Sequence, residues 1–327
     1  MISIIICSRR KNVLDNFLSS IERTIGAPYE LVVIDNTENR YNIFSAYNYG
    51  VGQAKGDILL FAHEDLVMRS EGWGADLEKY MAEDPEIGMI GVVGTQCVAK
   101  APRGWNTWGM QGENVRPMCR IVQNVGDPKY SFEGEKCFCM TCHNPEGVAI
   151  TQAMGVDGLM FAIRRKLFDD GMVRFDEETY GGFHCYDIDM SMQVAQCKKV
   201  MVLLDIELKH LSNGSYNRDY YISYYKYYMK WKDRLPKGVH PLPDPPLFNQ
   251  LNAIPYFRGM VKSGLFTKKE IRSYADGYFA TIADERRTRF YYAVLYYTRY
   301  YHRFGAGRAV TGVYNLTRKI FPKRKKY

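Results

Sequence analysis

The sequence has no apolar run that approaches the roughly 18 residues needed by a membrane-spanning helix. It also does not open like a secretory leader, because a strand-like run at residues 1–6 precedes Arg9 and Arg10, whereas a leader carries its positive charges first. Only 8 of the 327 residues are cysteine, and they are scattered apart from one group, which argues against a disulfide scaffold. We therefore expect a cytoplasmic protein with reduced thiols.

Positive charge is concentrated in one part of the chain. The formal net charge is +8, and lysine and arginine crowd the last third, ending in the basic segment 318–326. This favours an anionic partner, but no nucleic-acid-binding motif accompanies it, so we expect no nucleic acid. For the tyrosine-rich helices expected at 216–231 and 284–303 we favour packing against the rest of the chain. For the tail we favour peripheral contact with an anionic membrane.

The first 65 residues alternate between two periodicities. Apolar, β-branched runs predict strands at 2–7, 30–34 and 58–62, and helices are expected between them at 12–25 and 43–54. Such a β-α-β-α-β order with short connections predicts a parallel sheet. Right-handed crossovers then place the carboxyl ends of the three strands along one edge.

That edge carries residues that can bind a metal. His63, Glu64 and Asp65 directly follow the third strand, and ligands of open α/β sheets bind at the carboxyl ends of the strands. Because side chains alternate along a strand, His63 and Asp65 would point one way and Glu64 the other. An imidazole and a carboxylate on one side can hold a divalent cation and leave positions for diphosphate oxygens. The alternative is a polar loop that only ends a strand.

The ends of the first two strands could contribute to a nucleotide site. Asp35 follows the second strand and could accept a hydrogen bond from a base or ribose, while Arg9 or Arg10 could meet a phosphate. Asp35 can equally serve as a helix N-cap or a turn residue.

Four segments resemble family 2 glycosyltransferases with the GT-A fold, namely 4–8 (IIICS), 31–37 (LVVIDNT), 46–50 (AYNYG), and 54–57 (AKGD) with the strand and motif that follow it. In that family the third strand ends in a D-x-D-type motif, usually two aspartates, that binds the ribose and the metal on a nucleotide diphosphate. Here His63 stands where the first aspartate is usual, and Asp65 is kept. Across the whole chain the sequence is most similar to streptomycin-biosynthesis-type glycosyltransferases, whose motif also looks like H-x-D.

The resemblance implies an α/β fold, the Rossmann-like mixed sheet of GT-A enzymes, over residues 1–215. A tyrosine-rich, basic helical region would follow at 216–327. The resemblance also implies a Mn²⁺ or Mg²⁺ ion held by Asp65, by His63, and by His210, which follows a strand expected at 200–208. The residues that it places around the nucleotide are Cys7, Ser8, Arg9, Asp35, Asn36, Asn48, Lys55, His63 and Glu64.

Residues 181–189 (GGFHCYDID) resemble the family's E-D-x-D-like motif, which carries the catalytic base. They open a helix expected to reach about residue 198, whose N-terminal dipole favours ionised acids in the first turn. Tyr186 replaces the usual glutamate, whereas Asp187 and Asp189 match. We assign the base to Asp187, with Asp189 as the second choice. The alternative is that both acids only cap the helix.

Other residues are candidates for the sugar or the acceptor. Residues 152–165 resemble the family's D-G-x-x-x-A-x-R-R segment, so Asp157 and Gly158 would face the donor sugar or the acceptor, although Asp-Gly is also a turn signal. We expect the same of His184. Trp105 and Trp108, in the irregular stretch 99–150, could stack on a sugar ring or belong to the core. The group Cys137, Cys139, Cys142 and His143 leaves a structural zinc and ordinary thiols as alternatives.

Together these observations predict a metal-dependent, inverting glycosyltransferase. It would move a sugar from a nucleotide-diphosphate donor to a hydroxyl of a saccharide or lipid-linked acceptor. The alternative is a protein of the same fold that binds a sugar nucleotide or carbohydrate without catalysis, because His63 and Tyr186 depart from the family pattern.

Overall fold

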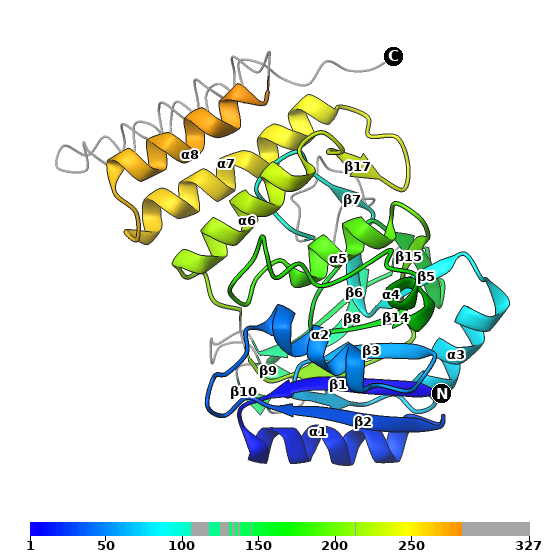
Figure 1. The fold of residues 1–327 in the computed structure, drawn as a ribbon. Coiled ribbons are helices and arrows are strands. Elements are labelled where there is room, and N and C mark those ends of the chain that lie inside the picture. The colour runs from blue at the N-terminus through cyan, green and yellow to red at the C-terminus, as the bar shows by residue number, and fades with distance from the viewer. Residues whose placement is uncertain are drawn as a thin grey trace.

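The computed structural model describes residues 1–105, 118–124, 131–132, 135–136, 138–144, 146–212 and 214–282, and the structural statements below concern these residues. A sheet lies at the centre of the molecule, with α1 (Lys11–Thr24) beneath it and the helices α6 (Arg218–Trp231), α7 (Pro245–Ser263) and α8 (Lys268–Ala280) gathered at the other end (Figure 1).

The central sheet has seven strands in the order β12-β15-β5-β14-β3-β1-β2. It is mixed, because β1 runs parallel to both β2 and β3, whereas β14 lies antiparallel between β3 and β5. Its strands are β1 (Ile2–Ser8), β2 (Tyr29–Asp35), β3 (Ile58–Ala62), β5 (Ile87–Gly91), β12 (Ile150–Ala153), β14 (Met160–Arg164) and β15 (Lys199–Leu203).

Both faces of the sheet are covered, which explains why β1 and β3 are apolar without alternation. Ile4 and Leu60 belong to one hydrophobic cluster with Phe17 of α1 (Lys11–Thr24). Their neighbours Ile5 and Leu59 point to the other face, where they join the cluster that includes α2 (Ile43–Gln53). The other helices of this part are α3 (Trp73–Glu83), α4 (Arg165–Asp169) and α5 (Tyr186–Val194).

The registers of the parallel strands confirm the predicted edge. Ser8 lies opposite Asp35, and Ile6 lies opposite Ala62, so the carboxyl ends of β1, β2 and β3 are level with one another.

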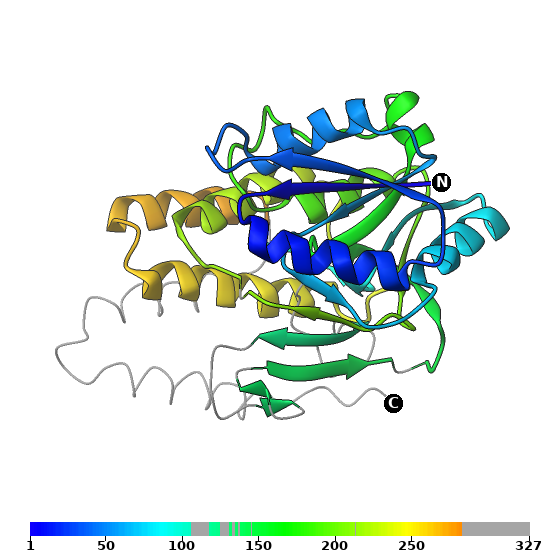
Figure 2. The same ribbon diagram turned by 90° about the horizontal axis from the view of Figure 1, so that it is seen from below.

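A second sheet runs in the order β13-β6-β8-β16-β4, with β11 paired to β8. In Figure 2 its green antiparallel strands lie apart from the blue strands of the central sheet. The strands are β4 (Leu66–Met68), β6 (Val93–Thr95), β8 (Met118–Asn124), β11 (Phe138–His143), β13 (Gly155–Val156) and β16 (Leu208–His210). Two small pairs complete the strands, β9 (Ser131–Phe132) with β10 (Glu135–Lys136), and β7 (Cys97–Val98) with β17 (Lys237–Gly238).

Three stretches with the apolar pattern of a strand are each divided into shorter strands. The stretch 88–94 divides into β5 and β6, 152–165 contains β12, β13 and β14, and 200–208 divides into β15 and β16. At each break the chain crosses from one sheet to the other: β5, β12 and β15 lead into the second sheet, and from β13 the chain returns to the central sheet at β14. Apolar patterning alone does not distinguish one long strand from two short strands in different sheets.

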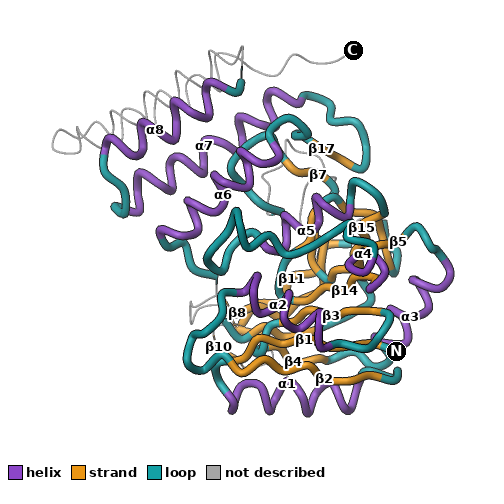
Figure 3. Tube along the Cα trace, in the orientation of Figure 1, coloured by secondary structure: helices purple, strands orange, loops and turns teal. Residues whose placement is uncertain are grey.

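The described C-terminal portion is helical, as expected. It consists of α6 (Arg218–Trp231), α7 (Pro245–Ser263) and α8 (Lys268–Ala280), seen together as purple coils in Figure 3. Tyrosines of α6 pack on the other two helices, with ring centroids 5.7 Å apart for Tyr221 and Tyr256 and 5.1 Å apart for Tyr228 and Tyr278.

This agrees with the packing expected of the tyrosine-rich helix α6. The sequence did not predict α7, because residues 237–246 are rich in proline and prolines usually mark helix boundaries. The helix expected at 284–303 and the basic segment 318–326 lie outside the described residues. No helix among those described has the length and hydropathy to cross a bilayer.

Candidate metal and catalytic site

Two histidines and an aspartate meet at the edge of the central sheet. His63 follows β3, Asp65 precedes β4, and His210 ends β16. Because β4 and β16 pair with Leu66 opposite His210, the histidine is brought beside Asp65. One ligand atom from each of the three lies within 4.8 Å of the others. Within the described parts of the chain this is the one such group of three or more histidine, cysteine or acidic side chains.

The His210 ring is oriented by Gln123 on β8. The Gln123 amide nitrogen donates to the carbonyl oxygens of Ser212 (2.6 Å) and Asn124 (3.2 Å), so the amide oxygen faces the imidazole. That oxygen lies 2.9 Å from Nδ1 of His210 and can only accept, so Nδ1 carries the proton. The unprotonated Nε2 therefore faces Asp65 Oδ1, 3.6 Å away, His63 Nδ1, 3.5 Å away, and the Ser212 hydroxyl, 3.5 Å away.

His63 and Asp65 have charge states that suit a cation. Burial lowers the pKa of His63 to about 4, so its imidazole is neutral at neutral pH. Burial alone would raise the pKa of Asp65, but when His210 is protonated its hydrogen bond and charge, together with Ser212, hold the pKa of Asp65 well below its usual value. The site therefore offers an anionic oxygen and a neutral His63 nitrogen, with the Nε2 lone pair of His210 beside them.

These residues fit a divalent metal. Oδ2 of Asp65 is buried, and no residue that the structure describes gives it a hydrogen bond. Its ion-pair partner is Arg10, whose Nη2 lies 3.5 Å away. A buried acceptor without a donor is costly unless something else satisfies it. Two imidazoles with one carboxylate suit Mn²⁺ better than Mg²⁺, which prefers an all-oxygen set.

Glu64 points away from this group, as the strand alternation predicted. Its carboxylate accepts hydrogen bonds from Ser8 Oγ (2.7 Å), from the backbone N–H groups of Arg9 and Arg10 (both 2.9 Å), and from Arg10 Nε (3.0 Å). Burial alone would raise the pKa of Glu64, but these hydrogen bonds hold it below its usual value. Glu64 thus anchors the turn between β1 and α1 and positions Arg10 beside Asp65.

Of the remaining residues expected around a nucleotide, Asp35, Asn36 and Cys7 lie at the carboxyl ends of β1 and β2. Asp35 is exposed at the end of β2 and accepts the N–H of Thr37 (2.9 Å), which lowers the pKa of Asp35 and gives it the turn geometry noted above. Asn36 is buried beside it, and its side chain binds both backbone groups of Tyr41 and lies 3.5 Å from the half-buried Cys7 thiol.

Two of these residues lie elsewhere. Asn48 of α2 binds the backbone oxygen of Phe175 (2.8 Å) and the side chain of Glu177 (2.6 Å), so it secures a neighbouring loop. Lys55 is exposed at the amino end of β3, where its N–H donates to Glu30. It therefore lies at the opposite edge of the sheet from His63, and the structure does not bring it to the site.

Asp187 lies in the first turn of α5 and is 7 % exposed. Its carboxylate accepts the backbone N–H of Gly158 (3.0 Å) and of Ile188 (2.8 Å). Burial, together with the charge of nearby Asp157, raises the pKa of Asp187 to about 7. A carboxylate with this pKa suits a general base at neutral pH.

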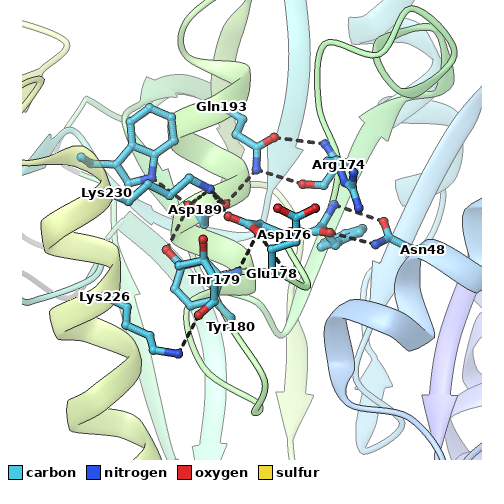
Figure 4. A network of polar contacts seen from close by, with 12 residues as sticks. Asn48, Arg174, Asp176, Glu178, Thr179, Tyr180, Asp189, Gln193, Lys226 and Lys230 are labelled. Atoms are coloured by element: carbon cyan, nitrogen blue, oxygen red, sulfur yellow. Dashed lines mark hydrogen bonds and ion pairs between the residues drawn. The ribbon is translucent and has the colours of Figure 1, made fainter.

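Asp189, two residues further along α5, is in a different environment (Figure 4). One of its oxygens accepts from Tyr180 Oη (3.1 Å) and Trp231 Nε1 (2.8 Å), and the other accepts from Gln193 Nε2 (2.8 Å) and Lys230 Nζ (2.9 Å). These four donors occupy the carboxylate and connect α5 to α6. The geometry therefore favours Asp187 over Asp189 as the base.

Gly158 and Tyr186 join Asp187 to the metal-ligand group. The Tyr186 hydroxyl donates to the backbone oxygen of Gly158 (2.9 Å) and lies 2.6 Å from Nε2 of His63. Asp157 accepts the N–H of Leu159 (2.8 Å), and its burial raises its own pKa. The expected pair Asp157 and Gly158 is thus adjacent to the predicted base and, through Tyr186, to His63.

Aromatic side chains border the same region. Phe183 is 46 % exposed, and its ring centroid lies 5.6 Å from that of His63. His184 stands edge-on to Tyr220 at 5.4 Å, and its Nε2 is buried without a hydrogen-bond partner among the residues described. Trp105 is half-buried and packs against both hydrophobic clusters, which favours its core interpretation, and Trp108 lies outside the described residues.

The cysteine group is only partly described. Cys137 and the side chain of Cys139 lie outside the described residues. Cys142 and His143 are consecutive on β11, so their side chains point to opposite faces of the strand.

Sequence reasoning missed three contacts of the candidate site, namely Gln123 with His210, Arg10 with Asp65, and Tyr186 with His63. No local pattern marked Gln123, which falls in a stretch interpreted as irregular. Tyr186 was noticed only as a departure from the family motif.

Comparison with known proteins identifies the family. A model of the glycosyltransferase-like family matches residues 3–230, more than half of the chain. No curated sequence is similar enough to count as a match.

Similar solved structures include GalNAc-T7 with UDP, GalNAc and Mn²⁺ (13% identity, TM-score 0.46, 77% of this chain and 53% of that one). Two others are S. aureus TarS 1–349 (13% identity, TM-score 0.43, 91% of this chain and 80% of that one) and S. aureus TarS (12% identity, TM-score 0.48, 94% of this chain and 54% of that one). The chain spans about half the length of the first and the last of these.

Proposed function

The chain belongs to the glycosyltransferase-like family, and from this premise we propose a metal-dependent enzyme that transfers a sugar from a nucleotide-diphosphate donor to an acceptor hydroxyl. Its mixed α/β sheet with a helical C-terminal portion is the GT-A architecture that the sequence predicted. The observation that carries the proposal is the convergence of His63, Asp65 and His210 within 4.8 Å of one another.

The three convergent side chains would hold Mn²⁺ through His63 Nδ1, an Asp65 oxygen and His210 Nε2. When bound, the cation would supply positive charge that neutralises the departing nucleoside diphosphate. The guanidinium of Arg10, which bridges Glu64 and Asp65, adds a second positive charge at the same edge. Its side chain is 54% exposed, so it remains accessible to a phosphate group.

Asp187 is the proposed base. Its carboxylate takes the proton of the acceptor hydroxyl while that oxygen forms a bond to the anomeric carbon. The bond from the same carbon to the diphosphate oxygen breaks, and the electron pair leaves with the diphosphate. Attack from the face opposite the leaving group inverts the configuration. The raised pKa of Asp187, about 7, supports this role because the group can both accept and release a proton near neutral pH.

The acceptor, the domain boundary and the cellular location are also matters of proposal or prediction. We take the acceptor to be a saccharide or a lipid-linked saccharide, and the resemblance to the streptomycin-biosynthesis-type group stays a prediction. We treat residues 1–215 as the catalytic domain and 216–327 as its extension, supported by the bond from Lys230 of α6 to Asp189 of α5. A cytoplasmic location and membrane contact through 318–326 stay predictions from the sequence.

Thermal stabilisation by a panel of sugar nucleotides, with and without Mn²⁺, tests the proposal. A ligand that binds only the folded state raises the melting temperature, so at least one sugar nucleotide should do so in a Mn²⁺-dependent manner. The same compound should release its nucleoside diphosphate in the presence of enzyme. His210→Ala should lose the Mn²⁺-dependent shift, whereas His240→Ala, at an exposed position, should keep it.

The outcomes separate the two functions considered above. Stabilisation without release of nucleoside diphosphate, with or without saccharide acceptors, would favour a sugar-nucleotide-binding protein that lacks catalysis. If neither Mn²⁺ nor any sugar nucleotide shifts the melting temperature, the metal-dependent transferase is refuted.

A further inference from the structure

The two positions at which the sequence departs from the family pattern are in direct contact. His63 stands where an aspartate is usual, and Tyr186 stands where a glutamate is usual. They are 123 residues apart in the chain, yet His63 Nε2 and Tyr186 Oη are 2.6 Å apart. The tyrosine ring is 4 % exposed and packs against Phe44, Tyr47 and Phe161, so its hydroxyl has little freedom to point elsewhere.

The hydrogen-bond partners of Tyr186 decide where its proton goes. The backbone oxygen of Gly158 has no proton and can only accept, and it lies 2.9 Å from the tyrosine hydroxyl. A hydroxyl has a single proton, so when Tyr186 donates it to Gly158, the bond to His63 requires a proton on the histidine. His63 then carries its proton on Nε2 and donates it to the tyrosine oxygen. Both hydrogen bonds are satisfied only in this arrangement.

The consequence appears at the other nitrogen of the same ring. With the proton on Nε2, Nδ1 of His63 has a free lone pair, and it lies 3.5 Å from Nε2 of His210. That second nitrogen is also unprotonated, because Gln123 takes the proton on Nδ1 of His210. Two lone pairs therefore face each other beside the carboxylate of Asp65, an arrangement that is unfavourable by itself and is stabilised by a cation between the three.

We propose that Tyr186 is a positioning residue that sets the tautomer of His63 and thereby makes Nδ1 its metal-binding atom. The inference rests on the proposed metal-dependent function and deepens it. Partners of this kind fix the tautomer and the ring orientation of metal-binding histidines. Here the donor chain runs from His63 through the tyrosine hydroxyl to the backbone of Gly158.

The same residue ties the metal ligands to the proposed base. Gly158 accepts from Tyr186 through its oxygen and donates to Asp187 through its N–H, 3.0 Å from the carboxylate. Tyr186 and Asp187 are also adjacent in the first turn of α5. A side chain at position 158 would overlap the Tyr186 hydroxyl, so this close approach requires glycine.

Mn²⁺ binding to the purified full-length chain, measured by calorimetry and by the electron paramagnetic resonance of free Mn²⁺, tests the proposal without any substrate. Tyr186→Phe keeps the buried ring and removes only the hydroxyl. We expect its affinity for Mn²⁺ to fall by about 10–100-fold, the usual effect of losing such a partner. In a His63→Ala background the same change should cause no further loss, because the affected ligand is already absent.

Tyr47→Phe is the matched control. The Tyr47 ring lies 5.6 Å from that of Tyr186 in the same cluster. Its hydroxyl is buried and has no hydrogen-bond partner in the part of the chain that the structure describes. Removing it should leave the Mn²⁺ affinity unchanged. Melting temperatures of the metal-free variants, measured alongside, show whether Tyr186→Phe is folded.

A second measurement uses the wild-type protein and does not depend on the folding of any variant. Long-range ¹H–¹⁵N spectra of histidine-labelled protein loaded with Zn²⁺, which is diamagnetic, report which nitrogen of His63 is protonated. We expect the proton on Nε2. A proton on Nδ1 would overturn the proposal, as would unchanged Mn²⁺ affinity in Tyr186→Phe. If the wild-type protein itself binds no Mn²⁺, the proposed metal-dependent function fails as well, and the wild-type titration distinguishes the two results.

Discussion

Asp187 and Asp189 are two residues apart on α5, are both buried, and have opposite surroundings. We predict that replacing each by asparagine separates catalysis from stability. Asp187→Asn should abolish most of the transfer activity and leave the protein folded. Asp189→Asn should lower the free energy of unfolding and leave the activity of the folded protein largely intact.

The magnitude for Asp187 follows from its pKa. The ordinary value is 3.8, and the folded-state pKa is about 7. A carboxyl whose pKa is raised by folding stabilises the native state fully below its unfolded pKa, and this contribution is lost as the pH rises through the folded pKa. Between pH 5 and pH 8 the wild-type protein should therefore lose about 3 kcal/mol that Asp187→Asn does not lose. Removing a general base typically costs about 10²–10⁴-fold in rate.

The magnitude for Asp189 follows from its hydrogen bonds. The oxygen that accepts from Gln193 Nε2 and Lys230 Nζ would become an NH₂ group in one orientation of asparagine, and the oxygen that accepts from Tyr180 and Trp231 would do so in the other. In the first orientation Gln193 loses its acceptor, whereas Lys230 Nζ also lies 2.8 Å from the retained oxygen; in the second, Tyr180 and Trp231 lose theirs. In both, the negative charge beside Lys230 is removed, and Asp176 is its one remaining ionic partner among the residues that the structure describes. Breaking a fully buried ion pair costs about 3–5 kcal/mol, and because the Lys230 side chain is 27% exposed we expect a loss near the lower end of that range.

Urea unfolding followed by circular dichroism at the two pH values measures both effects. Taking the difference between variant and wild type at each pH cancels the other titrating groups. Release of nucleoside diphosphate from the sugar nucleotide found by the stabilisation screen measures activity. The reasoning is refuted if Asp189→Asn loses activity while keeping its stability, or if the stability difference for Asp187→Asn is the same at both pH values.

Three further predictions concern the edge of the site and the C-terminal helices. Gln123→Leu removes the acceptor that orients His210 and should weaken Mn²⁺ binding by about 10-fold or more in calorimetry, so an unchanged affinity would contradict the tautomer assigned to that ring. Without metal, we expect negligible hydrolysis of a sugar nucleotide in the absence of acceptor. With Mn²⁺, kcat/KM should rise with pH as Asp187 loses its proton. The apparent pKa of this rise should be at or below about 7, because the cation favours the carboxylate. A pH-independent kcat/KM would argue against Asp187 as the base. Thr267→Ala breaks the capping box with Glu270 and should cost about 1 kcal/mol in urea unfolding, so an unchanged free energy of unfolding would contradict the stabilising role of this cap.

The sequence by itself determined the elements whose pattern is local. The apolar runs of β1, β2 and β3, with helices between them, were sufficient to predict a parallel arrangement and a common edge for Ser8, Asp35 and His63. Alternation along the chain after β3 was sufficient to separate Asp65 from Glu64. These features depend on neighbours within a few residues, which is why their boundaries changed little.

Tertiary structure decided what each polar group at that edge can do. His210 reaches Asp65 because β16 pairs with β4, and the sequence offered only its place in the order of motifs. Asp187 and Asp189 look alike in the sequence. In the structure Trp231 and Lys230 of α6 donate hydrogen bonds to Asp189, whereas Asp187 is buried and accepts the N–H of Gly158. The proton positions on the two histidines depend likewise on residues far away in the chain. The acidity and lone-pair direction of a side chain are set by burial and by hydrogen-bond partners, and folding brings those partners from distant segments.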